Sequence, residues 1–332
     1  MQAILRAARV LLIILPVYLV GAHAAARHGV KFSADEIAFA AEVAQAGGPS
    51  QAAVLDILSR VKVQSSILEA IARPAEAVKP WKDYRPIFMT DQRIADGVAF
   101  LRANRALLTR IGSEYGVPPQ IIVAIIGVET GYGRNLGKYR VIDALDTLAF
   151  HYPPRAKFFR GELKQVFLLG NRLAVPIEQL MGSYAGAMGW CQFMPTSIAN
   201  WAKDEDGDGR IDLWNSLPDI TASVANYFQA HGWQNGQPTA VRAQAASDAR
   251  ALDAANSEPL YSVRQIQAMG YEPVDRVNGD ALATLLTLDG AQGTEYWITF
   301  GNFQAITRYN RSPLYAMAVW QLAQAIARDA AS

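Results

Sequence analysis

The sequence predicts a mainly α-helical protein of the α+β class, with a small β-containing insertion before its last helix. Two observations lead to this prediction. Apolar residues recur at helical spacing through most of the 332 residues, and glycine, proline and serine residues divide them into separate helices. Runs typical of β-strands occur within residues 236–304, where Asp-Gly and a further glycine separate residues 282–288 from residues 296–300 and predict a hairpin.

The composition fits a globular protein and excludes several kinds of site. With 51% hydrophobic and 18% charged residues, the chain can bury a substantial core in two or three lobes. The formal net charge of +1 gives no electrostatic signature of nucleic-acid binding, so we expect no nucleic-acid partner. One cysteine, Cys191, cannot form an intramolecular disulfide, and together with four histidines it cannot build a zinc site.

Residues 1–24 are typical of an export signal. Arg6 and Arg9 precede an apolar stretch at residues 10–20, which ends in the cleavage pattern Ala22-His23-Ala24. The stretch is shorter than the roughly 20 residues that span a bilayer, which argues against the alternative, an uncleaved inner-membrane signal anchor. No cysteine directly follows the stretch, so we expect a periplasmic protein secreted through a cleaved signal peptide and not a lipoprotein.

Residues 25–107 are predicted to form an N-terminal helical region. Ser33 and Glu36 fit a capping box at a helix start. Gly47-Gly-Pro-Ser50 divides residues 33–72 into two helices, with Ser50 capping the second. Residues 73–90 are rich in proline and aromatic residues and are predicted to be extended, whereas residues 91–115 return to a helical period.

The next segment, residues 108–235, contains the most informative residue, Glu129. An almost unbroken apolar run at residues 121–128 predicts a buried helix. The helix is expected to begin near the prolines at positions 118 and 119 and to end before the glycines at positions 131 and 133. At the C-terminus of such a helix, lost hydration and the helix dipole both raise the pKa of a carboxyl group. A raised pKa suits a proton donor near neutral pH. The alternative is a structural ion pair with Arg134 or Arg140.

Residues 204–215 resemble the opening of an EF-hand calcium loop. Oxygen ligands stand at positions 1, 3 and 5 (Asp204, Asp206, Asp208), glycine at position 6, and Arg210 at position 7, where a backbone carbonyl serves. Asn215 replaces the usual bidentate glutamate at position 12, and Asp219 is the candidate that closes the site. Crowded carboxylates repel one another without a cation, which favours structural Ca²⁺ over an acidic turn that binds nothing.

The stretch at residues 182–195 combines glycines with the neutral hydrogen-bonding side chains of Ser183 and Gln192. Such a turn lets a ligand approach the backbone closely and suits an uncharged amide or hydroxyl group. Cys191 lies in this turn without a nearby histidine, so we expect a buried thiol and not a nucleophile.

The chain ends with residues 305–332, predicted to return to the core. Tyr309 and Asn310 follow a β-like segment, and Tyr315 stands at the start of a helix over residues 314–329, so these side chains can line a groove. Ser312 with proline at the first helical position is also an ordinary helix start, and both readings can hold together.

These segments resemble a known family. Glu129-Thr-Gly-Tyr-Gly matches the E-[ST]-x-x-G motif of lysozyme-like lytic transglycosylases, and residues 186–195 match their G-x-x-G-x-x-Q-[FI]-M-P signature. The context of residues 115–150, the calcium loop and residues 306–310 resemble the lytic murein transglycosylase B family, in a soluble form. The resemblance covers residues 34–330 and implies a lysozyme-like helical core.

The resemblance implies cleavage of the β-1,4 bond between N-acetylmuramic acid and N-acetylglucosamine in peptidoglycan, with 1,6-anhydromuramoyl products. Most glycosidases use two carboxylates, whereas this chain offers one strong candidate. Glu129 would act first as general acid and then as base, with no cofactor in the chemistry. The alternatives are a catalytically silent peptidoglycan-binding protein on the same fold and a hydrolytic muramidase.

The resemblance also assigns the binding residues. Ser183 and Gln192 would hold the acetamido group with Met188 packed beside it, and Tyr309 and Asn310 would border the scissile sugar. It further places groove aromatics and a contact to the peptide stem at Tyr84, Tyr227, Tyr315 and Arg155. The implied partners are glycan strands and cell-wall synthesis enzymes, and we expect a monomer. The chain departs from the family at Cys191, a position usually not cysteine, and in lacking a lipobox cysteine.

Overall fold

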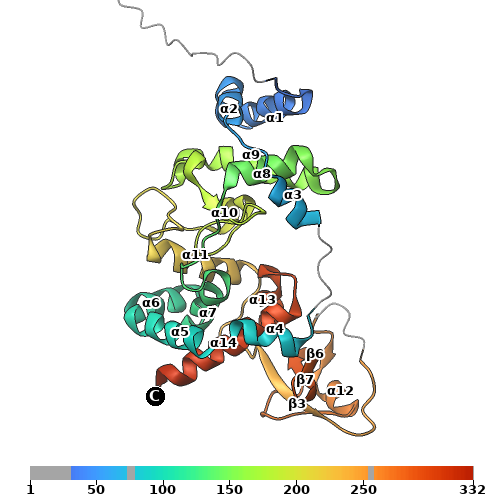
Figure 1. Cartoon of the computed structure of the whole chain (residues 1–332). Helices are drawn as coiled ribbons and strands as arrows, with labels where there is room; N and C mark the ends of the chain where they lie inside the picture. Colours follow the sequence, from blue (N-terminus) through green and yellow to red (C-terminus); the bar gives the residue numbers. More distant parts are fainter. Residues whose placement is uncertain (1–30, 73–78, 253–257, 332) are drawn as a thin grey trace, which may run out of the picture. The chain divides into compact units, whose positions relative to one another are not determined.

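The computed structural model describes residues 31–72, 79–252 and 258–331. Residues 33–332 form one unit and residues 1–32 another, and each is considered by itself. The predicted signal peptide and its cleavage site lie outside the described residues. Within residues 33–332, helices predominate and a small sheet precedes the C-terminal helices (Figure 1), which confirms the predicted mainly α, α+β class.

Three helices, and not two, follow Ser33: α1 (Ala34–Gln45), α2 (Gln51–Leu58) and α3 (Ser65–Ala72). The predicted capping box is present, with the Ser33 N–H donating to Glu36 Oε2 at 2.6 Å, and Ser50 caps α2. The unpredicted break before α3 has a tertiary cause. The backbone N–H groups of Lys62 and Gln64 donate to the Asp143 and Thr147 side chains of a later helix.

The prediction of an extended segment at residues 73–90 is wrong for its second half, which forms helix α4 (Trp81–Phe88) despite an internal proline. Trp81 is buried and stacks on Tyr84 one turn later, with ring centroids 6.4 Å apart. Packing of α4 against the C-terminal helix therefore outweighs the local cost of the proline. Residues 91–115 are helical as predicted, but Asn104 divides them into α5 (Asp91–Ala103) and α6 (Arg105–Tyr115).

Helix α7 (Pro119–Thr130) is central, because residues 121–128 are all buried. It contacts α5, α6, α11 (Leu217–Ala230) and α14 (Pro313–Ala331). The rest of this region is built from α8 (Val141–His151), α9 (Ala156–Leu169), α10 (Pro195–Trp201), three 3₁₀ turns (Pro153–Arg155, Gly170–Arg172, Ile177–Gln179) and the paired strands β1 (Tyr139–Arg140) and β2 (Met181–Gly182).

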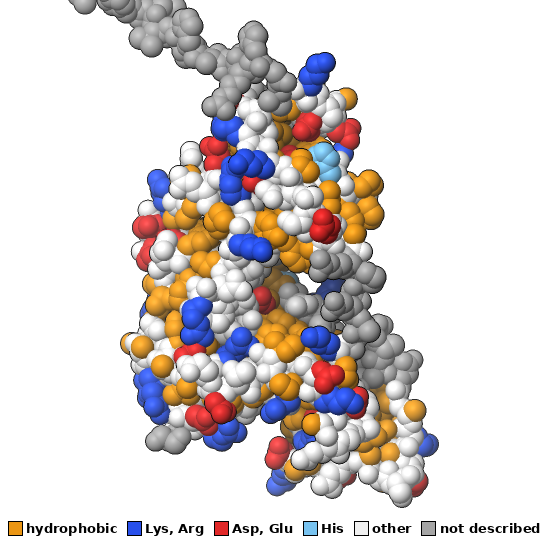
Figure 2. Space-filling model, viewed as in Figure 1, with side chains coloured by type: hydrophobic (Ala, Val, Ile, Leu, Met, Phe, Trp, Pro, Cys, Tyr) orange, Lys and Arg blue, Asp and Glu red, His pale blue; other side chains and the backbone are white. Residues whose placement is uncertain are grey.

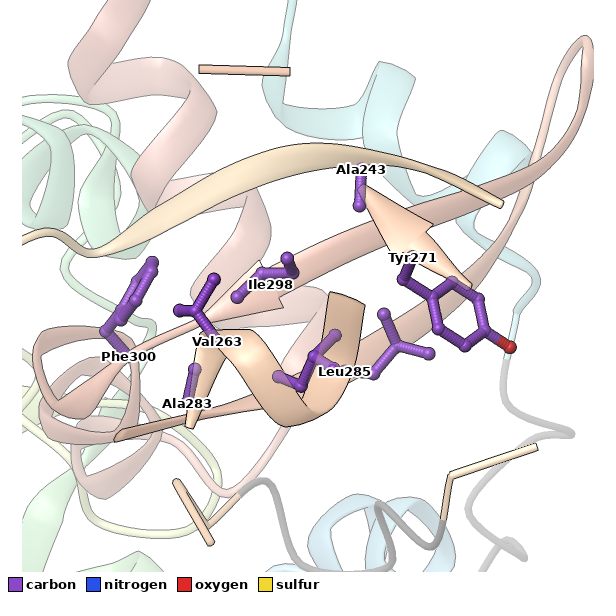
Figure 3. Packing of buried hydrophobic residues seen from close by; sticks show 8 residues of the cluster. Ala243, Val263, Tyr271, Ala283, Leu285, Ile298 and Phe300 are labelled. Atoms are coloured by element: carbon purple, nitrogen blue, oxygen red, sulfur yellow. The ribbon is translucent and has the colours of Figure 1, made fainter. Parts of the chain in front are cut away.

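The β-containing region is a five-stranded antiparallel sheet in the order β4-β6-β7-β3-β5. The strands are β3 (Ala240–Ala245), β4 (Tyr261–Ser262), β5 (Tyr271–Pro273), β6 (Leu282–Gly290) and β7 (Gly293–Thr299), and β6 and β7 form the predicted hairpin. Helix α12 (Val263–Ala268) covers one face, where Val263 packs with Leu285 and Ile298 (Figure 3). This region therefore has a small hydrophobic core of its own.

Two helices follow the sheet, where one was predicted. Helix α13 (Gly301–Tyr309) occupies the segment expected to be β-like before Tyr309, and α14 follows directly. Within the described residues, no single helix is long and apolar enough to cross a membrane. One pair bent by 108°, α6 with α7, meets that test by length and composition alone.

Candidate active site

Glu129 lies in the last turn of α7, and of residues 121–130 it alone retains partial exposure. Its Oε1 accepts a hydrogen bond of 2.5 Å from the Tyr315 hydroxyl, contributed by the first turn of α14. Burial raises the pKa of Glu129 to about 7, and the Tyr315 hydrogen bond opposes part of that rise. The site thus holds a carboxyl group that gives up its proton near neutral pH.

The predicted alternative, an ion pair between Glu129 and Arg134 or Arg140, is wrong. Arg134 pairs with Asp96 at 2.6 Å, and Arg140 pairs with Asp143 at 3.2 Å. Both arginines therefore neutralise other carboxylates, and the charge of Glu129 is controlled by burial and by a hydroxyl group.

The turn at residues 182–195 is held by backbone pairing and by two side chains from the predicted set. Ser183 Oγ accepts the N–H groups of Ala185 and Ala187, at 3.3 and 3.0 Å, and Met188 is buried inside the turn. Gln192 has a positive φ of 48° and donates to the Gly189 carbonyl at 2.9 Å. The Ser183 hydroxyl proton and the Gln192 Oε1 have no partner among the described residues, so they can serve a ligand amide.

The Glu129 motif and this turn are packed directly onto each other. A Cβ atom on Gly133 would lie 2.2 Å from the Trp190 ring, so only glycine allows this approach. Tyr132 between the two glycines has a φ of 62°, and its hydroxyl donates to the Arg93 carbonyl at 2.9 Å. Non-glycine residues with positive φ are uncommon and gather at functional sites. Sequence reasoning missed this role of Tyr132, although its position between two glycines was a signal.

Tyr309, from the end of α13, closes another side of the site. Its hydroxyl donates to the Cys191 carbonyl at 2.7 Å, and its ring lies 4.8 Å from that of Tyr227. Asn310 follows it and is exposed. Cys191 itself is buried as expected, and burial raises the pKa of its thiol, which makes it a poor nucleophile.

The residues expected to be groove aromatics differ in their surroundings. Tyr84 is half-buried, and burial followed by the Glu129 charge raises its pKa, so Tyr84 lies within electrostatic range of Glu129. Tyr227 is buried, donates to the Arg308 carbonyl and stacks on His231 with centroids 3.9 Å apart, so that face is closed to a sugar. Tyr315 is also buried and contacts Glu129 through its hydroxyl, in place of the expected stacking. Arg155 lies over the Phe158 and Phe159 rings.

The acidic loop brings together part of its predicted ligand set. Carboxylate oxygens of Asp204, Asp206 and Asp219 lie within 4.8 Å of one another, a spacing that fits ligands around one Ca²⁺ ion. Asp219 is fully buried and also accepts the Glu205 and Asp212 N–H groups, both at 2.8 Å. Asp208 is outside this group, and its Oδ1 accepts the Arg210 N–H at 2.8 Å.

Comparison with known proteins identifies the family of the chain. Residues 31–324 match the family model described as the transglycosylase SLT domain. The chain is 44% identical over 282 residues to the membrane-bound lytic murein transglycosylase B of Escherichia coli (strain K12), covering 82% of this chain and 77% of that protein.

Several solved structures have a similar fold, and two of those below contain a ligand. The soluble lytic transglycosylase SltB1 from Pseudomonas aeruginosa is 45% identical, with a TM-score of 0.83 over 90% of this chain and 100% of that one. Escherichia coli Slt35 in complex with calcium is 40% identical, with a TM-score of 0.82 over 90% and 94%. Pseudomonas aeruginosa SltB3 in complex with NAG-NAM-pentapeptide is 31% identical, with a TM-score of 0.80 over 90% and 80%.

Proposed function

Because the chain belongs to the transglycosylase SLT domain family, whose named relatives are lytic murein transglycosylases, we propose that it cleaves peptidoglycan glycan strands with Glu129 as its single catalytic carboxyl group. The bond broken is the β-1,4 linkage between N-acetylmuramic acid and N-acetylglucosamine. The reaction forms a new 1,6-anhydromuramoyl end on one of the two products.

In the first step, the protonated Glu129 carboxyl group donates its proton to the glycosidic oxygen as the C1–O bond breaks. A carboxyl group with a pKa of about 7 is about half protonated at neutral pH, and its proton transfer is well matched to that task. The N-acetyl carbonyl of the muramoyl residue supports the departure by forming an oxazolinium-like intermediate. Ser183 and Gln192 would orient that acetamido group through their free hydrogen-bonding atoms.

In the second step, the Glu129 carboxylate takes the proton of the muramoyl C6 hydroxyl, whose oxygen forms the new bond to C1 as the bond between C1 and the acetamido oxygen of the oxazolinium-like intermediate breaks and the N-acetyl group is restored. The acid is thereby restored, and neither water nor a second carboxylate takes part. The nucleophile is already attached to the sugar, so proximity supplies much of the rate.

The observation that carries this proposal is the isolation of Glu129 from other acids. Its pKa is set by burial and by Tyr315, and no acidic side chain in the described ranges contributes to the shift. A hydrolytic muramidase needs a second carboxylate to position water across the sugar, so the lack of a second acid near Glu129 among the described residues favours the intramolecular reaction.

The decisive experiment is mass spectrometry of purified sacculi digested with the wild-type protein and with Glu129→Gln. We expect 1,6-anhydromuramoyl products from the wild type and a loss of at least about 10³-fold for the variant, since the amide can neither donate nor accept the proton. Circular dichroism should show unchanged folding. Reducing ends would support the muramidase, absence of products the silent binding protein, and turnover by the variant would refute the role of Glu129.

Several further assignments complete the proposal. Structural Ca²⁺ would be held by Asp204, Asp206 and Asp219 with the backbone carbonyl of Arg210, without joining the chemistry. We place the protein in the periplasm. We assign residues 25–107 to an N-terminal helical region, 108–235 to the catalytic core, 236–304 to the β-containing region and 305–332 to the C-terminal segment that returns to the core. Glycan strands are the substrate, and cell-wall synthesis enzymes are candidate partners of a monomer.

A further inference from the structure

Two adjoining cavities lie between helices α4 and α14 and strands β3 and β7, and none of the residues assigned above to the chemistry lines them. Their volumes are about 540 and 630 Å³, and they share a wall made by Arg85, Arg242, Trp297 and Gln321. Cavities of this size accommodate a small ligand or a short peptide. We call them together the α4–sheet groove.

Basic side chains dominate the first of these cavities. Lys82, Arg85 and Arg242 line it, opposed by Glu295 as the single acidic lining residue. Lys and Arg side chains also gather on the surface where α4 approaches the sheet (Figure 2). The second cavity adds Asp91, Asp275 and Arg328, so the excess of positive charge is greatest in the first.

Arg85 differs from the other two bases in having no carboxylate partner among the described residues. Lys82 pairs with Asp289 at 3.0 Å, and Arg242 pairs with Glu295 at 2.6 Å. The Arg85 Nε donates to Gln321 Oε1 at 2.7 Å, which holds the guanidinium group in place. Its two Nη groups remain available as a fixed pair of donors, which is the geometry that binds a carboxylate.

Indole rings supply the apolar part of the groove. Trp81 lines the first cavity, and its buried Nε1–H has no acceptor in the part of the chain that the structure describes. Trp297 is half-buried beneath the Arg242 guanidinium, which lies 5.2 Å from its ring centre. A buried donor without a partner is costly, so a ligand acceptor here would be stabilising.

We propose that the α4–sheet groove is a second peptidoglycan site, which binds the carboxylate-bearing stem peptide at a distance from the scissile bond. This inference rests on the proposed function for the identity of the ligand. An uncharged glycan would leave Arg85 unpaired, whereas a stem peptide offers carboxylates to Arg85 and apolar groups to the indoles. Helix α4 links both sites, since it carries Tyr84, which lies within electrostatic range of Glu129, and Arg85 in the groove.

The test is isothermal titration calorimetry of the full chain carrying Glu129→Gln, with free stem pentapeptide as the probe. We expect that adding Arg85→Gln weakens binding about tenfold, because a charged hydrogen-bonded pair is lost. The matched control is Arg105→Gln, an exposed arginine on α6 that lines neither cavity, and it should leave binding unchanged. Pentapeptide with amidated carboxyl groups should lose the same tenfold against the Glu129→Gln protein.

The proposal that the groove binds the stem peptide would be refuted if the pentapeptide did not bind. Equal affinity in the Arg85→Gln and Arg105→Gln backgrounds would also refute it. Equal binding of the amidated pentapeptide would do the same. Failure of the proposed function is detected separately, by the wild-type protein on glycan strands stripped of peptide. If those strands yield no anhydro products while the pentapeptide still binds through Arg85, the catalytic proposal fails and the anionic-peptide site remains.

Discussion

At the scale of single residues, the chemistry depends on how tightly Glu129 holds its proton. Tyr315 donates a 2.5 Å hydrogen bond to this carboxylate, which stabilises the charged form and lowers its pKa against the effect of burial. The wild-type kcat/KM should therefore fall as pH rises through about 7, because the acid that protonates the leaving oxygen is lost.

Tyr315→Phe should move this alkaline limb to higher pH, since burial would then act unopposed. The measurement is the pH dependence of anhydro-product formation for the wild type and the variant, with Tyr296→Phe in the sheet as the matched control. An unshifted limb in Tyr315→Phe would mean that the hydroxyl positions Glu129 without tuning its pKa.

The sequence predicted the raised pKa of Glu129 but not its partner. The apolar run at residues 121–128 was enough to indicate desolvation, because burial follows from a local pattern. Tyr315 is 186 residues away in the chain, and the sequence indicated only that it could line a groove. Arg134 and Arg140 were the nearer candidates, and both prefer other carboxylates. Contacts of this kind depend on the tertiary arrangement of α7 and α14.

At the scale of elements, the junction between α7 and the turn at residues 182–195 depends on Gly133. It has a φ of +81° and faces the Trp190 ring. Gly133→Ala should therefore lower the free energy of unfolding by about 3 kcal/mol, from backbone strain and overpacking. Urea denaturation would measure this, with Gly161→Ala as the control because a Cβ there meets open space. Equal stability of the two variants would contradict the packing argument.

Helices and strands were predicted correctly where a local sequence pattern determines them, and incorrectly where tertiary packing determines them. Ser33 with Glu36 was sufficient to place the start of α1. Helix α4 was missed because Pro80 and Pro86 are typical helix breakers, whereas the burial of Trp81 and the packing of α4 against α14 stabilise the helix. The hairpin of β6 and β7 was predictable from its turn, but the pairing of β7 with β3 is set by residues about 55 positions apart.

The clustered carboxylates of the acidic loop lead to a prediction about stability in the presence of Ca²⁺. Titrating Ca²⁺ into chelated protein should raise the melting temperature, because the folded state alone presents the clustered carboxylates. Asp204→Asn should reduce this rise more than Asp208→Asn, since Asp208 lies outside the group within 4.8 Å. Differential scanning calorimetry would check the order, and equal effects of the two variants would contradict the assigned ligand set.

At the scale of the whole molecule, two buried acids tie stability to pH. The pKa values of Glu129 and Asp146 are both raised to about 7, chiefly by burial. Below the unfolded-state values near 4 both are protonated in either state, and the fold is not penalised. As pH rises towards 7 the unfolded chain ionises first, so the native state loses stability until its own carboxyl groups ionise.

Replacing either acid by its amide should therefore stabilise the protein above pH 7 and leave it unchanged near pH 4. For Glu129→Gln the gain should be at most about 3 kcal/mol, from the rise of the Glu129 pKa from its ordinary value of 4.5 to about 7. Asp146→Asn should show the same pH window while retaining activity, because Asp146 lies on α8 beside Asp143, away from the catalytic contacts described. Denaturation at pH 4 and pH 8, with anhydro-product assays in parallel, distinguishes an acid kept for catalysis from one that is only buried. A Glu129→Gln protein no more stable than the wild type at pH 8 would show that its carboxyl group is solvated, and the proposed proton donor would lose its physical basis.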